Sequence, residues 1–175
     1  MQKISNIRGI YRDILKGKEG DTRYDSGWVS NAIVDKCRVL LAGFMKNESS
    51  NGIQYLAVGK GLEQWDTTGA PAPDPVNITA LENKFMPTIP VSELQLAYLD
   101  ENEAEVAGPT HRLQITATLN PAYPEPIPPG NTYPLREFGL FGQLDSTDFM
   151  IDVIRHPVIH KDASSTLIRV VRLFF

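Results

Sequence analysis

The sequence has almost none of the residues that build disulfide-bonded or zinc-stabilised folds. Cys37 is the only cysteine among 175 residues, and there are three histidines. A single thiol cannot form a disulfide within the chain or complete a cysteine-based zinc site. We therefore expect no metal and no cofactor, and a fold held together by the apolar core that a chain of this length can bury.

Long apolar runs are also absent. No stretch approaches the roughly 20 apolar residues of a membrane-spanning helix, and Lys3, Arg8 and Arg12 interrupt the isoleucines near the N-terminus. The beginning of the sequence therefore lacks the unbroken apolar region of a signal peptide. We expect synthesis and folding in the cytoplasm, without direct insertion into a membrane.

Nor does the sequence carry a strong charge of either sign. Its formal net charge of −4 creates no field that would attract nucleic acid, which is therefore not an expected partner. The charges are unevenly spread, because residues 1–18 hold five bases and one acid, whereas 61–105 holds many acids and the single base Lys84. Opposite patches of this kind favour contact between subunits.

Residues 1–29 are predicted to form an N-terminal arm and its connection to a domain at 30–175. The arm's apolar residues recur at helical intervals, although Gly9 weakens a helix. Such an amphipathic arm can fold onto its own domain, bind a partner or lie on a membrane surface. The candidate partner contacts in the arm are Ile4, Ile7, Tyr11 and Ile14.

The clearest predicted helix runs from Ser30 to Lys46. Ser30 or Asn31 can cap it, and it ends in the Asn-, Ser- and Gly-rich segment 47–52. Its apolar residues form one stripe, made of Ile33, Cys37, Leu40, Leu41 and Phe44.

Strand patterns dominate the remainder of the sequence. The alternation of apolar and polar residues over 112–119 predicts a strand with one buried face. Other strands are expected over 53–58, 85–89, 94–99, 135–144, 149–154 and 167–175, separated by turn-forming residues. We expect an α+β fold that is mainly antiparallel β and sandwich-like, with one amphipathic helix near the N-terminus.

Two further segments are candidates for partner contacts. The proline-rich segment 121–130 cannot join a sheet; it is either a neutral connection or a stiff segment that docks on a neighbour through Tyr123 and Ile127. The strand at 167–175 is apolar on both faces, including Phe174, so its second face is covered either by the chain itself or by another subunit.

No motif in the sequence predicts catalysis or a small-molecule substrate. His156 and His160 are four residues apart, but Pro157 lies between them and the segment is predicted to be extended. The glycines of 59–61 lack phosphate-loop spacing. The acids of 100–105 and 145–148 have the composition of solvated loops and turns.

Several segments follow one another in an order found in a known group of proteins. They are the helix 30–46, the run 52–61 with Trp65-Asp66, the motif 137–142, and the run 154–161 leading to 167–173. In these segments the chain resembles proteins encoded in tail-assembly regions of bacteriophages and phage-tail-like contractile injection systems. The resemblance implies a structural component of the fibre, baseplate or surrounding cage, residing in a tail-like particle or virion, with no catalytic residue.

Three functions follow as hypotheses. A structural subunit would contact other particle subunits and copies of itself, typically as a trimer or hexamer. A carbohydrate- or receptor-binding module of such a particle would expose Trp28, Trp65 and several tyrosines together around a concave patch. A hydrolase would need buried carboxylates, or His156 and His160, within reach of each other in a pocket.

Overall fold

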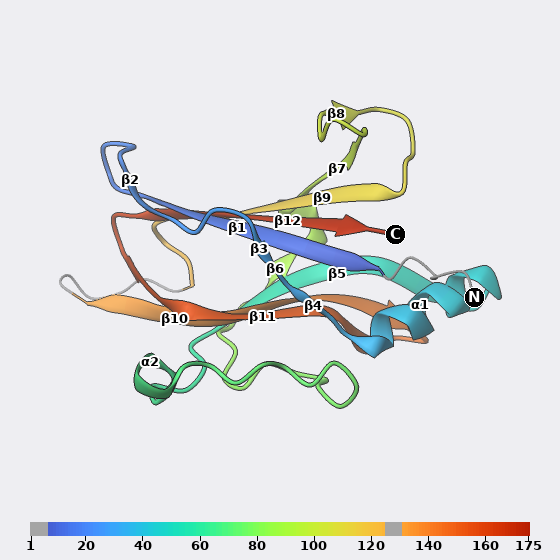
Figure 1. Ribbon diagram of the computed structural model, residues 1–175, viewed down its shortest axis with the longest axis horizontal. Coiled ribbons are helices and arrows are strands. Elements are labelled where there is room, and N and C mark those ends of the chain that lie inside the picture. Colours follow the sequence, from blue (N-terminus) through green and yellow to red (C-terminus); the bar gives the residue numbers. More distant parts are fainter. Residues whose placement is uncertain (1–6, 125–130) are drawn as a thin grey trace.

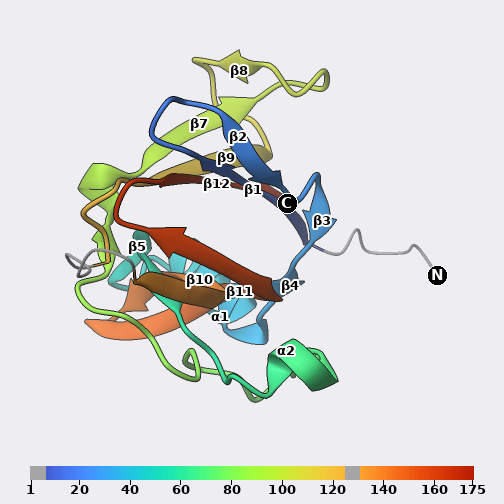
Figure 2. The same ribbon diagram turned by 90° about the vertical axis from the view of Figure 1, so that its left-hand side faces the viewer.

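The computed structural model describes residues 7–124 and 131–175 and consists of two packed antiparallel β-sheets (Figures 1 and 2). In sheet A the strand order is β2-β1-β12-β9-β7-β8, with β3 also paired to β1, and in sheet B it is β4-β11-β10-β5-β6. The α+β, mainly antiparallel sandwich expected from the sequence is confirmed.

Sheet A contains β1 (Arg8–Lys16), β2 (Thr22–Asp25), β3 (Val29–Ser30), β7 (Gln95–Leu99), β8 (Glu105–Val106), β9 (Arg112–Leu119) and β12 (Thr166–Phe174). Sheet B contains β4 (Ala32–Ile33), β5 (Ser50–Gly59), β6 (Ile89–Pro90), β10 (Thr132–Leu144) and β11 (Thr147–Asp162). The helical elements are α1 (Asp35–Met45), the short α2 (Trp65–Thr68) and the 3-10 turn η1 (Val91–Glu93).

The N-terminal segment forms a strand, so the helical arm expected over residues 1–18 is wrong for the residues that the structure describes. β1 pairs with β12 over all nine of its residues. Tyr11, Asp13 and Leu15 point into the core, and the side chains between them are more exposed. The spacing of the apolar residues in this segment fits a helical period, but pairing with β12 stabilises the extended backbone. Residues 8–16 therefore belong to the sandwich.

The amphipathic helix is confirmed as α1, but it begins later than predicted, at Asp35. The two expected capping residues are used elsewhere: Ser30 pairs with β1 in β3, and Asn31 lies between β3 and β4. The segment 29–33 thus crosses from sheet A to sheet B, because β4 pairs with β11. The buried face of α1 includes Cys37 and Leu40 and covers one end of sheet B.

The hairpin of β10 and β11 forms the centre of sheet B. Its turn places Asp145 and Ser146 at φ values of 49° and 63°, the left-handed backbone that a tight hairpin requires, so the turn expected at 145–148 is confirmed. The glycines of 137–142 allow close packing of the strands. A Cβ on Gly139 would lie 2.8 Å from the carbonyl oxygen of Asp152, and one on Gly142 would lie equally close to another backbone oxygen.

Most of the other predicted strands are present, as β5, β7, β9, β10, β11 and β12. β11 extends well past its predicted end, to Asp162. The strand predicted over Phe85–Ile89 is wrong, since only Ile89 enters a strand, the two-residue β6. Pro87 lies within this segment and cannot donate a ladder hydrogen bond.

The apolar core fills the space between the two sheets. Tyr11 of β1 packs edge-on against Phe138 of β10, with ring centres 5.5 Å apart. Fully covered core residues include Leu56, Ile115, Leu119, Leu135, Leu140, Leu167 and Val171. Both sheets therefore contribute one apolar face each, as in other two-layer folds.

Candidate functional site

A buried polar cluster, formed by Asp13, Arg169 and His156, lies inside this core. Arg169 donates from Nε and Nη2 to the two carboxylate oxygens of Asp13, at 2.6 and 2.7 Å, and both side chains are completely buried. Nη2 also lies 3.0 Å from Nε2 of His156. The guanidinium carbon is 3.6 Å from the ring centre of Phe138. The cluster therefore joins β1 and β12 of sheet A to β11 of sheet B.

The surroundings of His156 determine its protonation. Burial, followed by the positive charge of Arg169, lowers the pKa of His156 to about 4. Its Nδ1 lies 2.7 Å from the carbonyl oxygen of Pro157. A neutral ring with its proton on Nδ1 satisfies both contacts, because Nε2 then accepts from Arg169. Both nitrogens are thus in use within the fold.

A second buried carboxyl, that of Asp152 on β11, lies near this cluster. It accepts hydrogen bonds from the backbone nitrogen of Leu140 at 3.0 Å and from Nδ2 of Asn31 at 2.7 Å. Burial raises the pKa of Asp152 to about 7, against the opposing effects of these hydrogen bonds and of Arg169. Asp152 therefore connects β10, β11 and the crossing segment at Asn31.

The segment around the glycines at 59–61 also has an internal role. Arg136 donates to both carboxylate oxygens of Asp66, at 2.7 and 2.6 Å, and to the carbonyl oxygen of Lys60 at 2.9 Å. Glu137 accepts from the backbone nitrogen of Asn83 at 2.8 Å. These contacts fasten the long loop between β5 and β6 to β10.

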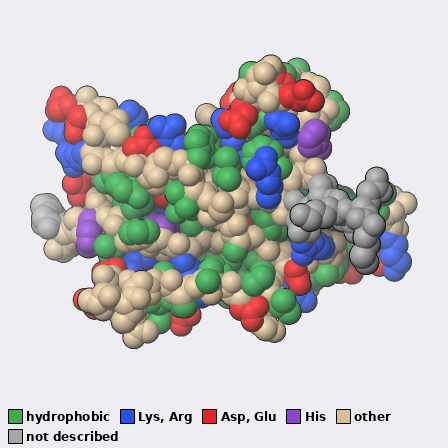
Figure 3. All heavy atoms as spheres, viewed as in Figure 1, with side chains coloured by type: hydrophobic (Ala, Val, Ile, Leu, Met, Phe, Trp, Pro, Cys, Tyr) green, Lys and Arg blue, Asp and Glu red, His purple; other side chains and the backbone are tan. Residues whose placement is uncertain are grey.

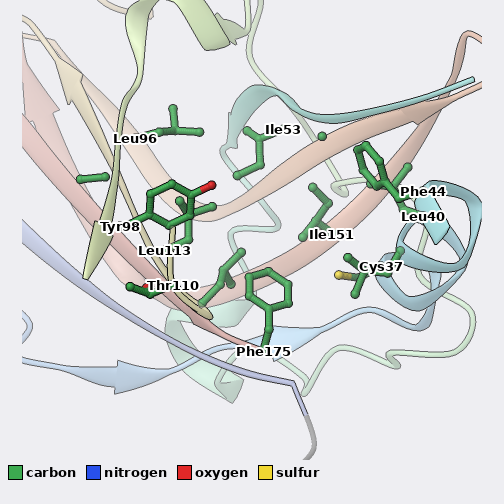
Figure 4. A pocket seen from close by; sticks show the side chains of 14 residues that line it. Cys37, Leu40, Phe44, Ile53, Leu96, Tyr98, Thr110, Leu113, Ile151 and Phe175 are labelled. Carbon is green, nitrogen blue, oxygen red and sulfur yellow. The ribbon is translucent and has the colours of Figure 1, made fainter. Parts of the chain in front are cut away.

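An apolar cleft opens at the end of the sandwich where α1 and β7 face each other (Figure 4). Its volume is about 470 Å³. Its lining is nearly all apolar and consists of Cys37, Leu40, Leu41, Phe44, Gly52, Ile53, Leu96, Ala97, Tyr98, Thr110, Leu113, Ile151, Leu173 and Phe175. Four of these are large and exposed, namely Phe44 (44%), Leu96 (42%), Tyr98 (39%) and Phe175 (42%).

The apolar cleft arises because sheet A extends beyond the part of it that sheet B covers. In the β7–β9 ladder Leu96 lies opposite Ile115, and Tyr98 lies opposite Leu113, so these residues share the inward face of the sheet. Ile115 is completely buried, whereas Leu96 one strand further out is exposed. The cover over sheet A therefore ends between β9 and β7.

The structure separates the predicted arm contacts. Ile4 lies outside the described residues, and Ile7 and Ile14 are half-buried. Tyr11 is a correction: it is only 4% exposed, and burial and the charge of Asp13 raise its pKa to about 12. It packs in the core because odd-numbered residues of β1 face inward.

Of the three predicted contacts nearer the C-terminus, Tyr123 and Phe174 are engaged within the chain. The Tyr123 hydroxyl donates to the carbonyl oxygen of Pro87 at 2.8 Å. Phe174 is buried, with the guanidinium carbon of Arg8 4.4 Å from its ring centre and that of Arg112 at 6.0 Å. Ile127 lies outside the described residues. Neither Tyr123 nor Phe174 lines the apolar cleft.

The aromatic and metal-binding candidates are also dispersed. Trp65 is buried, with the guanidinium carbon of Arg155 4.8 Å from its ring centre. Trp28 is 40% exposed, and the guanidinium carbon of Arg172 in sheet A is 4.2 Å from its ring centre. Among the described residues no group of three or more His, Cys, Asp or Glu side chains could hold a metal ion. Burial raises the pKa of the Cys37 thiol to about 11.

None of the helices in residues 7–124 and 131–175 has the length and apolar character needed to cross a membrane. Comparisons with family models, curated proteins and solved structures found no match.

Sequence reasoning identified only one wall of the apolar cleft. Cys37, Leu40, Leu41 and Phe44 belong to the predicted helical stripe, and the structure places them in the lining. The opposite wall, with Leu96, Tyr98 and Phe175, was not among the predicted contacts. The signal available for it was the pair of apolar residues at alternate positions of the predicted strand 94–99.

Proposed function

We propose that this chain is a structural subunit of a phage-tail-like particle, in its baseplate, fibre or cage region, and that it acts through protein–protein assembly. The proposal rests on the sequence resemblance of residues 30–175. The structural observation that supports it is the apolar cleft, whose rim exposes Phe44, Leu96, Tyr98 and Phe175. Contiguous exposed apolar surface of this kind marks interaction sites in soluble proteins.

The use of the buried charges inside the fold is consistent with this proposal. Asp13, Arg169 and His156 bind one another, and Asp152 is bound by Asn31 and a backbone amide. Catalytic groups need access to a substrate, whereas these groups connect strands. Their arrangement supports a structural role for the polar residues of the core.

A carbohydrate- or receptor-binding role for the same particle remains the alternative. Such a site is expected to bring exposed aromatic side chains together. Trp65 is buried and Trp28 lies beside β12 of sheet A, so neither tryptophan supports this alternative. The exposed aromatic residues that do lie together are Phe44, Tyr98 and Phe175 of the apolar cleft, where the rest of the lining is apolar, as in a surface for protein contact.

The test is the mass of the purified protein in solution, measured by light scattering during gel filtration, alone and with co-expressed neighbours from its gene cluster. We expect a trimer, a hexamer or a stoichiometric complex with a neighbour. A chain that stays monomeric and joins no neighbour would contradict the proposal and favour a ligand-binding role.

A further inference from the structure

The apolar cleft lies beside an open sheet edge. β7 pairs with β9 over Gln95–Tyr98, but on its other side β8 reaches only Tyr98 and Leu99. In the described part of the chain, residues 95–97 therefore have no strand on their outer side. An unpaired edge presents backbone donors and acceptors to an added strand.

The position of this edge fits the cleft. Leu96 lies within the unpaired stretch and Tyr98 follows it. Both point into the cleft towards Phe44 and Leu40 of α1, with Ile151 and Phe175 between them (Figure 4). Packed sheets are about 10 Å apart and paired strands about 4.8 Å apart. A strand added at the edge of β7 would therefore place every second side chain over the uncovered apolar surface.

The acidic residues around this edge indicate which charge the ends of the partner segment should carry. We call residues 91–106 the acidic lobe. They include η1, β7 and β8 and contain no lysine or arginine. The acids of the lobe are Glu93, Asp100, Glu101, Glu103 and Glu105. On the lobe that carries β7 and β8, the space-filling view shows acidic side chains beside a few basic ones (Figure 3), and Glu103 is paired with Arg172 of β12. A partner with basic residues next to this lobe would be complementary in charge.

We propose that the apolar cleft and the free edge of β7 bind an extended segment of a neighbouring subunit, with apolar residues at alternate positions and lysine or arginine at its ends. Backbone hydrogen bonds to residues 95–97 supply the pairing, and the cleft selects the apolar side chains. This inference rests on the proposed role in assembly and specifies the chemistry of the partner.

The test uses a peptide of about nine residues, with valine at alternate positions, threonine between them and lysine at both ends. Its binding to the full chain is measured by fluorescence anisotropy. Three control peptides are compared with it: a scrambled sequence without alternation, a version with glutamate at both ends, and a version methylated on alternate backbone nitrogens. We expect each control to bind at least about tenfold more weakly.

Matched variants locate the binding site on the protein. Phe44→Glu and Leu96→Glu place a charge in the cleft, and each is expected to weaken peptide binding by about tenfold or more. Val39→Glu is the control, because Val39 lies on the same helix, is also 44% exposed, and is outside the cleft lining. Leu96 is on the opposite wall of the cleft, so Leu96→Glu still tests the binding site if Phe44→Glu does not fold.

Equal binding of the scrambled or methylated peptide, or an equal loss in Val39→Glu, would overturn the proposal. Tighter binding of dodecanoate than of the peptide would assign the cleft to a lipid, and self-association abolished by Phe44→Glu would assign it to a second copy.

If co-expressed subunits assemble while the peptide does not bind, strand docking is wrong and the assembly proposal stands. If the peptide binds but the chain joins no subunit, strand docking stands and the assembly proposal fails.

Discussion

At the scale of single residues, Arg169 illustrates how this core accommodates charge. Its Nε and Nη2 are bound by Asp13 and His156, and its planar face lies over the ring of Phe138. Its Nη1, however, has no hydrogen-bond partner among the residues that the structure describes. A buried guanidinium is tolerated only where its charge is compensated, so the stability of the fold depends on the carboxylate of Asp13.

Removing that carboxylate is expected to be costly. Asp13→Asn leaves the charge of Arg169 buried without a counter-ion, which typically destabilises a protein by about 3–5 kcal/mol. Asp25→Asn is the matched control, because the carboxylate of Asp25 also accepts hydrogen bonds from Nε and Nη2 of an arginine, Arg12, but at the surface. Its effect should be much smaller. Urea denaturation measures the free energy of unfolding of both variants. Equal losses would contradict the claim that the buried pair of Asp13 and Arg169 matters more than a surface pair.

The pKa of Asp152, raised to about 7 by burial, makes stability depend on pH. Above pH 4 the unfolded carboxyl is ionised while the folded one keeps its proton, so the stability that this group contributes at low pH is lost as the pH rises through about 7. Asp152→Asn keeps a neutral group whose amide oxygen can accept from the backbone nitrogen of Leu140, and its amide nitrogen can donate to Oδ1 of Asn31 once the Asn31 amide is turned over. We therefore expect the variant to gain stability relative to the natural chain between pH 5 and pH 8, measured by denaturant unfolding at both values.

His156 acts in the opposite direction within the same pH range. Its pKa is lowered to about 4, so its contribution is complete above the unfolded value of about 6.5 and is lost as the pH falls through about 4. The comparison of Asp152→Asn with the natural chain isolates the carboxyl, because His156 is present in both. A stability difference that is the same at pH 5 and pH 8 would show that Asp152 does not titrate in this range.

At the scale of elements, the β10–β11 hairpin depends on glycines that face other backbone atoms. Gly139 lies so close to the carbonyl of Asp152 that no side chain fits without movement. Because the contact is to backbone, relief requires a shift of one strand against its neighbour. The motif 137–142 is thus constrained by sheet packing.

Gly139→Ala is expected to destabilise the protein by about 1–3 kcal/mol, the usual cost of overpacking. Gly108→Ala provides the control, since a Cβ at Gly108 has no atom within 4 Å and its φ is not positive. Thermal unfolding followed by circular dichroism compares the two. A Gly139→Ala variant as stable as Gly108→Ala would mean that β10 can shift freely against β11.

At the scale of the whole molecule, sheet A is completed by the two ends of the described chain. β1 and β12 are antiparallel, with Arg8 opposite Phe174, and they also share the ion pair between Asp13 and Arg169. Pairing of segments so distant in sequence adds loop-closure entropy to folding. β12 therefore has its partners on both sides only when β1 is present.

The boundary predicted from the sequence, with a domain at 30–175, can be tested directly. We expect a fragment of residues 30–175 to lack fixed tertiary structure, because it leaves Arg169 without Asp13 and exposes one edge of β12. Near-UV circular dichroism measures this. The control is a circular permutant that retains every residue, joins the two ends by a flexible linker and opens at the turn around Gly20. It keeps β1 beside β12 and should fold; a folded 30–175 fragment would contradict the role of β1.

The fold class, the amphipathic helix α1 and most strands of the sandwich could be predicted from the sequence, because apolar periodicity and turn chemistry are local properties. So could one wall of the apolar cleft, through the stripe of α1. That residues 8–16 form a strand depends on tertiary structure, since their apolar spacing fits both a helix and a strand and pairing with β12 stabilises the strand. Tertiary structure alone brought Asp13 to Arg169, 156 residues away in the chain, and left Leu96 and Tyr98 uncovered. Pairing and burial depend on which distant segments meet, and no local pattern encodes that.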